Sequence, residues 1–454
     1  MSNTYKSTGS FNYGDLSEIE KDIEDSGLDI KLSHNLDLFK TKRKIDDFII
    51  PNSIASLPME GGDASEDGKP TELTFRKYER IARGGVGLIW LEAVSVSKEG
   101  KSNDKQLWIT EENWTDFKKL NDLIKSSAKQ EFGEDHNPLT ILQLNHSGRY
   151  CKVKGKRKPI IATHKKLLDD KLGISKDYHL VTDEYLREVE EDFLQAARLA
   201  KKAGFNSVDI KSCHGYLLAE LLSAYERGGK YGGKFENRIK LLVDIIDRIR
   251  EDEYCKGLIL SSRLNIYDAV PYPQGWGVNK SSLNPDLNEP KELIKILEDK
   301  GVKLISLTMG NPYFIPHINK PYDIGTYTPD ESALESCNRL IKGIGEIQKS
   351  FPKIHIVGVG YSWFRHMAPY VGAGSLENGL CNIIGFGREG LAYPDFAKDI
   401  LNDGKMKKNR VCISCSKCSE MKSKIGTCGC VIRDSEVYLP IYNDMKKGEI
   451  VKDA

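Results

Sequence analysis

Eight short apolar segments, separated by longer stretches of helical periodicity, constrain the fold of this chain more than any other feature of its sequence. β-Branched residues are common in them, and each is largely apolar, as strands of a parallel sheet are when helices cover both faces. The predicted strands are residues 48–56, 86–92, 139–144, 207–211, 258–263, 304–307, 354–358 and 382–386.

Helical patterns lie between the predicted strands. Apolar residues recur at helical spacing in residues 71–83, 185–203 and 235–250, and Gly204 is a plausible C-cap for the second of these. Strand and helix repeated eight times predict an α/β fold of the (β/α)8 TIM-barrel type. An open doubly wound sheet would usually carry a glycine-rich dinucleotide turn after its first strand, and residues 50–63 contain no GxGxxG.

Two regions fall outside this repeat. Residues 1–45 are polar and highly charged, and we expect an N-terminal arm that wraps around the barrel or dangles from it. Residues 404–454 leave the barrel pattern and contain five of the ten cysteines. Although a chain of 454 residues would by length alone suggest about three domains, the sequence predicts one barrel (46–403) with an arm and a cysteine-rich tail.

Composition excludes several classes of partner. Lys and Arg total 67, Asp and Glu total 66, and the net charge is +1. Such a balance lacks the excess of positive charge that binds nucleic acid or an anionic membrane. No uncharged apolar run approaches the roughly 20 residues that span a bilayer, and the N-terminus lacks the apolar core of a secretory signal. We therefore expect a cytoplasmic protein without nucleic-acid or membrane partners.

Polar side chains near the carboxyl ends of the predicted strands should converge on one site, because active sites of such barrels lie at that end. Gln143 and Arg263 place an amide and a guanidinium inside the ring, where together they can hold a polar heterocycle with several acceptors. The alternative for Arg263 is a buried ion pair, for example with Glu92.

Lys211, His214 and Tyr216 follow the fourth predicted strand. Lysine and histidine are hydrogen-bond donors that can bind a carbonyl or phenolate oxygen. A charged donor forms a stronger hydrogen bond than a neutral one. The tyrosine hydroxyl is a candidate general acid. A surface lysine beside a hydrogen-bonded histidine is the alternative, although it does not explain three such groups together at a barrel mouth.

Glycines follow the seventh and eighth predicted strands, where barrels often bind phosphate. Gly360 and Gly387 expose backbone N–H groups, and Arg388 adds a positive charge. The alternative is that these glycines only form tight turns.

Taken together in chain order, these segments resemble the Old Yellow Enzyme family of FMN-dependent ene-reductases (NADH:flavin oxidoreductases). Within this family, the chain resembles in particular the barrel and iron–sulfur part of bacterial 2,4-dienoyl-CoA reductase. It covers roughly residues 48–400, and the ordered set of motifs is highly specific. The matching pieces are Pro58–Met59, Leu91–Ala93, Gln143–Arg149, Ala203–Leu217, Tyr231–Gly233 with Glu236–Arg238, and Gly387–Arg388.

The resemblance implies FMN at the barrel mouth. Pro58, Met59 and Ala93 would line the isoalloxazine through their backbones. Gln143 and Arg263 would meet its pyrimidine edge, and the phosphate would be held by Gly360, Gly387 and Arg388.

The resemblance also implies a reaction. Lys211 and His214 would orient a substrate carbonyl, reduced flavin would give hydride to the β-carbon, and Tyr216 would protonate the α-carbon. NADH or NADPH is the expected electron donor. Two positions depart from the family: Lys211 stands where most relatives have histidine, and Glu60 stands where many have cysteine or threonine near the flavin. The expected substrate is a planar conjugated ketone such as a flavone or steroid enone, or an enoyl-type compound.

The cysteines of the tail form a tight cluster, which in a long chain without an export signal more often binds metal than forms disulfides. The related reductases carry a [4Fe–4S] cluster just after the barrel. The resemblance implies that Cys412, Cys415, Cys418 and Cys430 are its ligands, with Cys428 as a possible replacement for Cys430. Four thiolates also suit tetrahedral zinc.

These residues support three hypotheses about the function. The first is an ene-reductase, which we expect to be a homo-oligomer. The second is an electron-transfer subunit that receives electrons from a partner protein through the cluster. The third is a non-catalytic barrel with a zinc-bound tail. Because only 24 residues follow Cys430, we expect no FAD- or NAD(P)H-binding domain, so electrons would come from a separate protein or directly from NAD(P)H.

Overall fold

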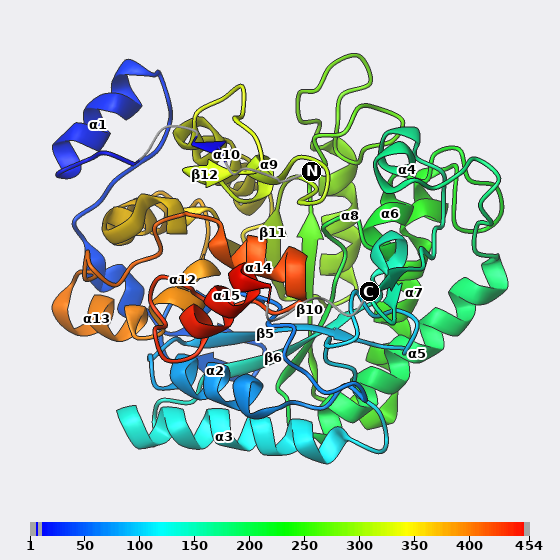
Figure 1. The fold of residues 1–454 in the computed structure, drawn as a ribbon, viewed down its shortest axis with the longest axis horizontal. Helices are drawn as coiled ribbons and strands as arrows, with labels where there is room; N and C mark the ends of the chain where they lie inside the picture. Colours follow the sequence, from blue (N-terminus) through cyan, green and yellow to red (C-terminus); the bar gives the residue numbers. More distant parts are fainter. Residues whose placement is uncertain (1–5, 8–10, 449–454) are drawn as a thin grey trace.

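A closed barrel of eight parallel strands forms the centre of the computed structural model, which describes residues 6–7 and 11–448. Each strand pairs with the next along the chain, and the last pairs with the first. Figure 1 shows the strands in the interior of the molecule, with helices around them. This arrangement confirms the predicted (β/α)8 fold. The barrel strands are β4 (Ile54–Ser56), β5 (Leu88–Ser95), β6 (Leu139–Asn145), β9 (Ser207–Ile210), β10 (Ile259–Asn265), β11 (Leu304–Thr308), β13 (His355–Gly358) and β14 (Ile383–Phe386).

The first predicted strand, 48–56, is two strands in the structure. β3 (Phe48–Ile50) pairs with β2 (Arg43–Ile45) in an antiparallel hairpin, and only β4 belongs to the barrel. Pro51 lies between β3 and β4, and its missing N–H prevents a continuous ladder of hydrogen bonds. The other short strands are β1 (Lys6–Ser7), β12 (Ile324–Gly325), β7 (Lys152–Val153) and β8 (Lys156–Arg157).

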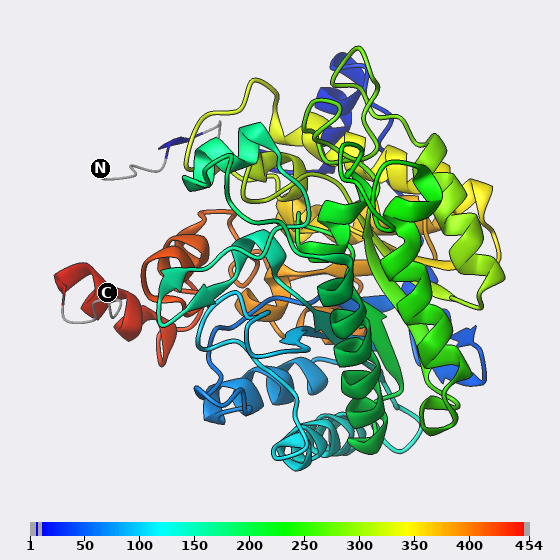
Figure 2. The same cartoon turned by 90° about the vertical axis from the view of Figure 1, so that its right-hand side faces the viewer.

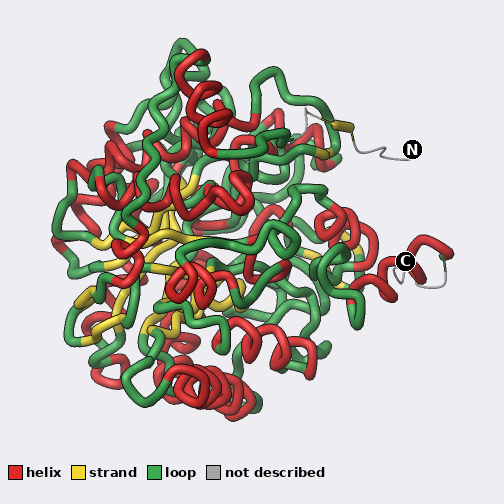
Figure 3. The backbone as a smooth tube through the Cα atoms, turned by 90° about the vertical axis from the view of Figure 1, so that its left-hand side faces the viewer, coloured by secondary structure: helices red, strands yellow, loops and turns green. Residues whose placement is uncertain are grey.

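Helices surround the strands, which Figure 3 shows as a central yellow group within red helices. The predicted helices at 71–83, 185–203 and 235–250 are α2 (Glu72–Ala82), α5 (Asp183–Lys202) and α7 (Phe235–Glu251). The remaining helices are α1 (Leu16–Asp25), α3 (Trp114–Phe132), α4 (Lys166–Leu172), α6 (Leu217–Leu222), α8 (Asn288–Asp299), α9 (Pro316–Asn319), α10 (Ala333–Ser350), α11 (Ala368–Glu377), α12 (Arg388–Ala392), α13 (Phe396–Asp403), α14 (Lys417–Ile425) and α15 (Tyr438–Lys447), with 3-10 turns η1 (Leu36–Lys40), η2 (Gly148–Tyr150), η3 (Glu253–Cys255) and η4 (Tyr361–Met367).

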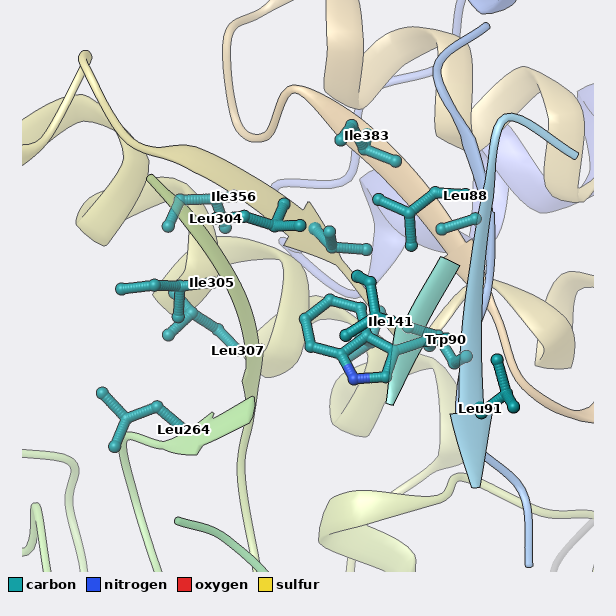
Figure 4. Packing of buried hydrophobic residues seen from close by; sticks show 14 of the residues in the cluster. Leu88, Trp90, Leu91, Ile141, Leu264, Leu304, Ile305, Leu307, Ile356 and Ile383 are labelled. Atoms are coloured by element: carbon teal, nitrogen blue, oxygen red, sulfur yellow. The ribbon is translucent and has the colours of Figure 1, made fainter. Parts of the chain in front are cut away.

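Apolar side chains of the barrel strands form the core (Figure 4). Leu88, Ile141, Leu304 and Ile356 are fully buried, and each such side chain contributes roughly 1.5–3 kcal/mol by leaving water. Trp90 on β5 is the largest of them, and its indole Nε1 donates to Asp209 Oδ2 at 2.8 Å. Among the described residues, no helix is both long and apolar enough to cross a membrane.

The N-terminal region packs on the barrel from residue 11 onward. Asp15 caps α1, which buries Ile19 and Ile23. Phe39 of η1 is fully buried, and a Cβ atom built on Gly372 of α11 would lie only 2.9 Å from its ring. From residue 11 onward, the described part of this region therefore packs against the barrel.

The cysteine-rich tail lies against the loop that follows β4. The backbone N–H of Cys428 donates to Gly61 O at 2.6 Å, and a Cβ atom on Gly62 would lie 1.9 Å from Gly426 O. α14 and α15 share a small apolar cluster that includes Met421 and Tyr438. Figure 2 shows this part, in orange-red and red, on one side of the barrel.

Candidate active site

Lys211 and His214 lie just after the end of β9. The Lys211 side chain is buried, with its Nζ 3.8 Å from Glu60 Oε1 and 4.1 Å from the centre of the Tyr216 ring. His214 adopts a φ of +65°, which turns the chain sharply between the two donors. Its Nε2 lies 3.4 Å from the Asn319 amide nitrogen.

The two donors differ in charge. Burial lowers the pKa of His214 well below its ordinary value, and Arg263 and Lys211 lower it further, so the imidazole is neutral at pH 7. Burial also lowers the pKa of Lys211, but the nearby Glu60 carboxylate opposes this. The pair therefore combines a neutral imidazole N–H donor with a lysine whose protonated form Glu60 favours.

Tyr216 is buried beside these donors. Its hydroxyl donates to Glu60 Oε1 at 3.3 Å and lies 2.6 Å from the hydroxyl of Tyr313. Burial, together with the Glu60 charge, raises the pKa of Tyr216 well above its ordinary value, so the phenol keeps its proton. The Tyr313 ring stacks on Tyr150 with centroids 3.8 Å apart and is 39% exposed. The sequence did not reveal Tyr313, which stands in an irregular loop after β11.

Glu60 is the shared partner of four side chains. Lys422 Nζ donates to its Oε2 at 2.7 Å, and Ser102 Oγ lies 3.4 Å from the same oxygen. Lys211 and Tyr216 face its Oε1. Burial alone would raise the pKa of Glu60, but Lys422 and Lys211 together lower it to about 2. Glu60 is therefore an anion inside the candidate site.

Gln143 and Arg263 converge on Asp209, a residue that no sequence motif indicated. Asp209 Oδ2 accepts from Gln143 Nε2 at 2.6 Å, and Oδ1 accepts from the backbone N–H of Arg263 at 2.5 Å. Asp209 thus fixes two neighbours that we expected to bind a heterocycle. It lies inside a short apolar strand, and only its charge in an otherwise buried segment could have indicated a role.

Arg263 does not pair with Glu92, so this alternative from the sequence is wrong. The Glu92 carboxylate instead accepts from Lys77 Nζ and, at 2.6 Å, from the backbone N–H of Gly61. Arg263 Nε is buried and makes no hydrogen bond to any other described residue. An unpartnered guanidinium N–H at a barrel mouth fits a ligand with hydrogen-bond acceptors, such as the pyrimidine edge of a flavin.

Pro58, Met59 and Ala93 lie at the adjoining strand ends. Pro58 and Met59 follow β4, and Ala93 on β5 is opposite Gln143 on β6, just after a register shift. Met59 approaches Gly387, where an added Cβ atom would lie 3.2 Å from its sulfur. These backbones therefore line the same end of the barrel as Gln143 and Arg263.

The phosphate-binding candidates are adjacent to the tail. Gly360 has a φ of +103°, which favours glycine, so the tight-turn interpretation also holds at this position. Within the described residues, the backbone N–H groups of Gly360, Gly387 and Arg388 donate to no other residue. Arg388 Nη1 donates to Pro321 O at 2.8 Å and to Ser414 Oγ at 3.1 Å.

The four predicted metal ligands line one pocket, together with Lys320 and Arg388. These ligands are Cys412, Cys415, Cys418 and Cys430. Cys428 is buried nearby, and its hydrogen bond to Cys418 lowers the pKa of the Cys418 thiol. All ten cysteines lie in the described part of the chain, and all are free thiols there. In that part, no three His, Cys, Asp or Glu side chains converge closely enough to hold a single metal ion.

Comparison with known proteins identifies relatives that match most of this chain. The model of the NADH:flavin oxidoreductase / NADH oxidase family matches residues 37–406. An NADH oxidase from Thermoanaerobacter brockii is 27% identical over 392 residues, which are 85% of this chain and 54% of that protein. An NADPH dehydrogenase from Bacillus subtilis is 33% identical over 270 residues, which are 59% of this chain and 71% of that protein.

Solved structures show the same fold. A 2-naphthoyl-CoA reductase in complex with 2-naphthoyl-CoA has a TM-score of 0.66 at 20% identity, covering 90% of this chain and 58% of the other. An Old Yellow Enzyme homologue from Zymomonas mobilis has a TM-score of 0.59 at 21% identity, covering 82% and 94%. The chain thus spans a little over half the length of the NADH oxidase and of the naphthoyl-CoA reductase.

Proposed function

Because the chain belongs to the NADH:flavin oxidoreductase / NADH oxidase family, we propose that it is an FMN-dependent ene-reductase, which reduces a C=C bond conjugated to a carbonyl. The observation that carries the proposal is the convergence of Lys211, His214 and Tyr216 beside the unpartnered Nε of Arg263. Two donors and a protonated phenol stand where a conjugated carbonyl would meet the cofactor.

The residues at the barrel mouth fit FMN. Gln143 and Arg263 would bind the pyrimidine edge, with Asp209 holding both in place. The free N–H groups of Gly360, Gly387 and Arg388 would hold the phosphate, and the backbones of Pro58, Met59 and Ala93 would line the ring system. When bound, FMN supplies the hydride for the β-carbon.

The chain's own side chains would orient the substrate and move a proton. Lys211 and His214 donate to the carbonyl oxygen, and the ammonium is the stronger donor because it is charged. Tyr216 gives its proton to the α-carbon. Since Tyr313 is partly exposed and its hydroxyl lies 2.6 Å from that of Tyr216, it can return a proton from solvent.

A planar substrate suits the aromatic side chains at this mouth. Tyr150, Tyr216 and Tyr313 form a stack, and aromatic faces favour flat ligands. Flavones, steroid enones and enoyl-type compounds share this shape. The 2-naphthoyl-CoA of the similar complex is a planar aromatic thioester, and it belongs in the same substrate panel.

We also propose a [4Fe–4S] cluster in the cysteine pocket, with NADH, NADPH or a separate protein as the electron donor. One zinc ion would draw four sulfurs around a single point, whereas a cubane cluster separates its thiolates because each binds a different iron. The four thiols that line one pocket supply the ligand number that such a cluster needs. In the cytoplasm, where we place the protein, such thiols stay reduced.

A second candidate function is electron transfer between a partner protein and FMN. It is favoured by Arg388, which belongs to the candidate phosphate site and also lines the cysteine pocket. Co-purification of a flavoprotein or ferredoxin-type donor would support this function. Efficient turnover with NADH or NADPH alone would argue against it.

The decisive experiment is anaerobic purification followed by visible spectroscopy and quantitation of flavin, iron and zinc. The ene-reductase proposal predicts a yellow protein that releases FMN on denaturation and then reduces members of an enone, enoyl-CoA, steroid and flavone panel. A colourless protein that rejects added FMN would refute it. Zinc without iron would indicate the structural tail instead of the cluster. Light scattering of the same sample tests the predicted homo-oligomer.

A further inference from the structure

We propose that Lys422, in the cysteine-rich tail, is a positioning residue of the active site: it neutralises Glu60 and thereby leaves the Lys211 ammonium free for a substrate oxygen. The inference rests on the proposed function, because it takes Lys211 as the substrate donor. It makes the tail part of the substrate site in addition to a place for metal.

The geometry separates the two lysines that face Glu60. Lys422 Nζ donates to Glu60 Oε2 at 2.7 Å, which is a charge-assisted hydrogen bond. Lys211 Nζ lies 3.8 Å from Oε1, beyond hydrogen-bond distance. Within the described residues no hydrogen bond joins Lys211 Nζ to any other group, so its donors remain available.

Charge balance explains why this separation depends on Lys422. Glu60 is a buried carboxylate, and leaving such a group unpaired is strongly unfavourable. With Lys422 in place, two ammonium groups face one carboxylate and a net positive charge remains for the substrate. Without it, Lys211 is the nearest cation and need move by only about 1 Å to close a hydrogen bond of normal length. Lys211 would then be held by Glu60.

The docking of the tail holds Lys422 in position. α14 carries Lys422, and the segment just after α14 lies on the loop that carries Glu60. Cys428 N donates to Gly61 O at 2.6 Å, and Thr427 Oγ1 donates to Gly62 O at 3.2 Å. The segment that follows the helix of Lys422 is therefore hydrogen-bonded to the two residues after Glu60, and this holds Lys422 close to Glu60.

A set of variants at these two positions tests the inference. Lys422→Met should weaken binding of the phenol 4-hydroxybenzaldehyde, followed by flavin absorbance, by about tenfold or more, since a charge-assisted hydrogen bond from Lys211 is lost. Lys422→Arg should keep the wild-type affinity. The double variant Glu60→Gln/Lys422→Met should recover it, because no carboxylate remains to capture Lys211.

Matched controls separate this role from tail anchoring. Lys424→Met changes the same helix at a lysine that pairs with Glu420, and it should leave binding unchanged. Lys422→Gln removes the charge but keeps a donor, so it supplies the same test if Lys422→Met does not fold. If the double variant binds as weakly as Lys422→Met, Lys422 only anchors the tail and the proposal is overturned.

A crystal structure of Lys422→Met or Lys422→Gln decides the inference even without flavin. We expect Lys211 Nζ to move within hydrogen-bond distance of Glu60. A Lys211 that keeps its 3.8 Å separation would overturn the proposal. A wild-type protein that binds no FMN would instead refute the proposed function, while this structure would still show whether Lys422 keeps Lys211 and Glu60 apart.

Discussion

Arg388 Nη1 donates to Ser414 Oγ at 3.1 Å, and this bond joins the first residue of α12, two positions after the last barrel strand, to the loop between two tail cysteines. The same guanidinium lines the cysteine pocket. One side chain therefore touches both of the cofactor sites that we propose.

Replacing Arg388 should impair both sites. For Arg388→Met we expect a lower FMN content, because the phosphate loses its charged partner, and a lower iron content, because the Ser414 contact is lost. Flavin and iron are measured in the same anaerobically purified sample. Arg410→Met is the control, since Arg410 pairs with Asp395 outside both sites. Loss of FMN with full iron retention would mean that Arg388 does not organise the pocket.

Asp209→Asn should weaken the hydrogen bonds that hold Gln143 and Arg263 in the candidate flavin site. The carboxylate accepts from Trp90, Gln143 and the backbone of Arg263, and an amide turns one of these acceptors into a donor. We expect a loss of about 1–3 kcal/mol in unfolding free energy and weaker FMN binding, measured by denaturation and by flavin titration. Asp299→Asn, in an exposed pair with Lys295, should change neither quantity.

Tyr216→Phe should slow oxidation of the reduced flavin by substrate while leaving reduction by NAD(P)H nearly unchanged. Loss of a general acid typically costs about 10²–10⁴-fold in rate. Tyr313→Phe should cause a smaller loss, because Tyr313 only returns the proton. Stopped-flow absorbance separates the two half-reactions, with exposed Tyr254→Phe as the control. Equal loss in both half-reactions would remove Tyr216 as the acid.

Lys211→Ala and His214→Ala should likewise impair reoxidation by substrate more than flavin reduction. Lys211 is buried and His214 is partly buried at the end of β9, beside the site where we place the carbonyl oxygen. The KM for the enone should rise more for Lys211→Ala, since an ammonium is lost instead of a neutral imidazole. Similar defects in reduction by NAD(P)H would argue against the donor-pair role.

Acid should weaken the wild-type protein through Glu60. The folded pKa of about 2 lies below the ordinary value of 4.5, so the stabilisation is complete above about pH 4.5 and is lost as the pH falls toward 2. It amounts to about 3 kcal/mol for a shift of this size. Denaturation at pH 6 and pH 3 should show a smaller acid loss for Glu60→Gln than for wild type. Identical losses would mean that Glu60 is not held as an anion.

Serine substitutions should identify the fourth cysteine ligand. Cys430→Ser should lose iron, whereas Cys428→Ser should retain it, because only Cys430 lines the pocket with Cys412, Cys415 and Cys418. Iron content and the visible spectrum of each variant give the answer. The opposite pattern would assign Cys428 as the ligand.

Residues near in sequence were predictable, and partners distant in sequence were not. Periodicity located the barrel strands because each buries both faces, and it located Gln143 and Arg263 because polar groups are unusual there. The first predicted strand was wrong at its start, since the apolar run continues through Pro51, which ends one ladder and precedes another. Nothing in the local pattern indicates that Lys422 contacts Glu60.

Asp209 illustrates a second limit. Its charge interrupts an apolar strand, but the sequence does not say which buried donors surround it. The pairing of Glu92 with Lys77, instead of Arg263, depends on how α2 packs beside β5. Tertiary packing therefore determines which cation pairs with each buried carboxylate.

The separation of Glu60 and Lys422 along the chain also has a consequence for biosynthesis. The two residues are 362 positions apart, so at about 5–20 residues per second the ribosome adds the lysine roughly 20–70 seconds after the glutamate. During that interval the Glu60 carboxylate has no Lys422 with which to pair. If our inference on Lys422 is correct, a chain that ended between β14 and Lys422 would carry every barrel strand, and its Lys211 would be held by Glu60.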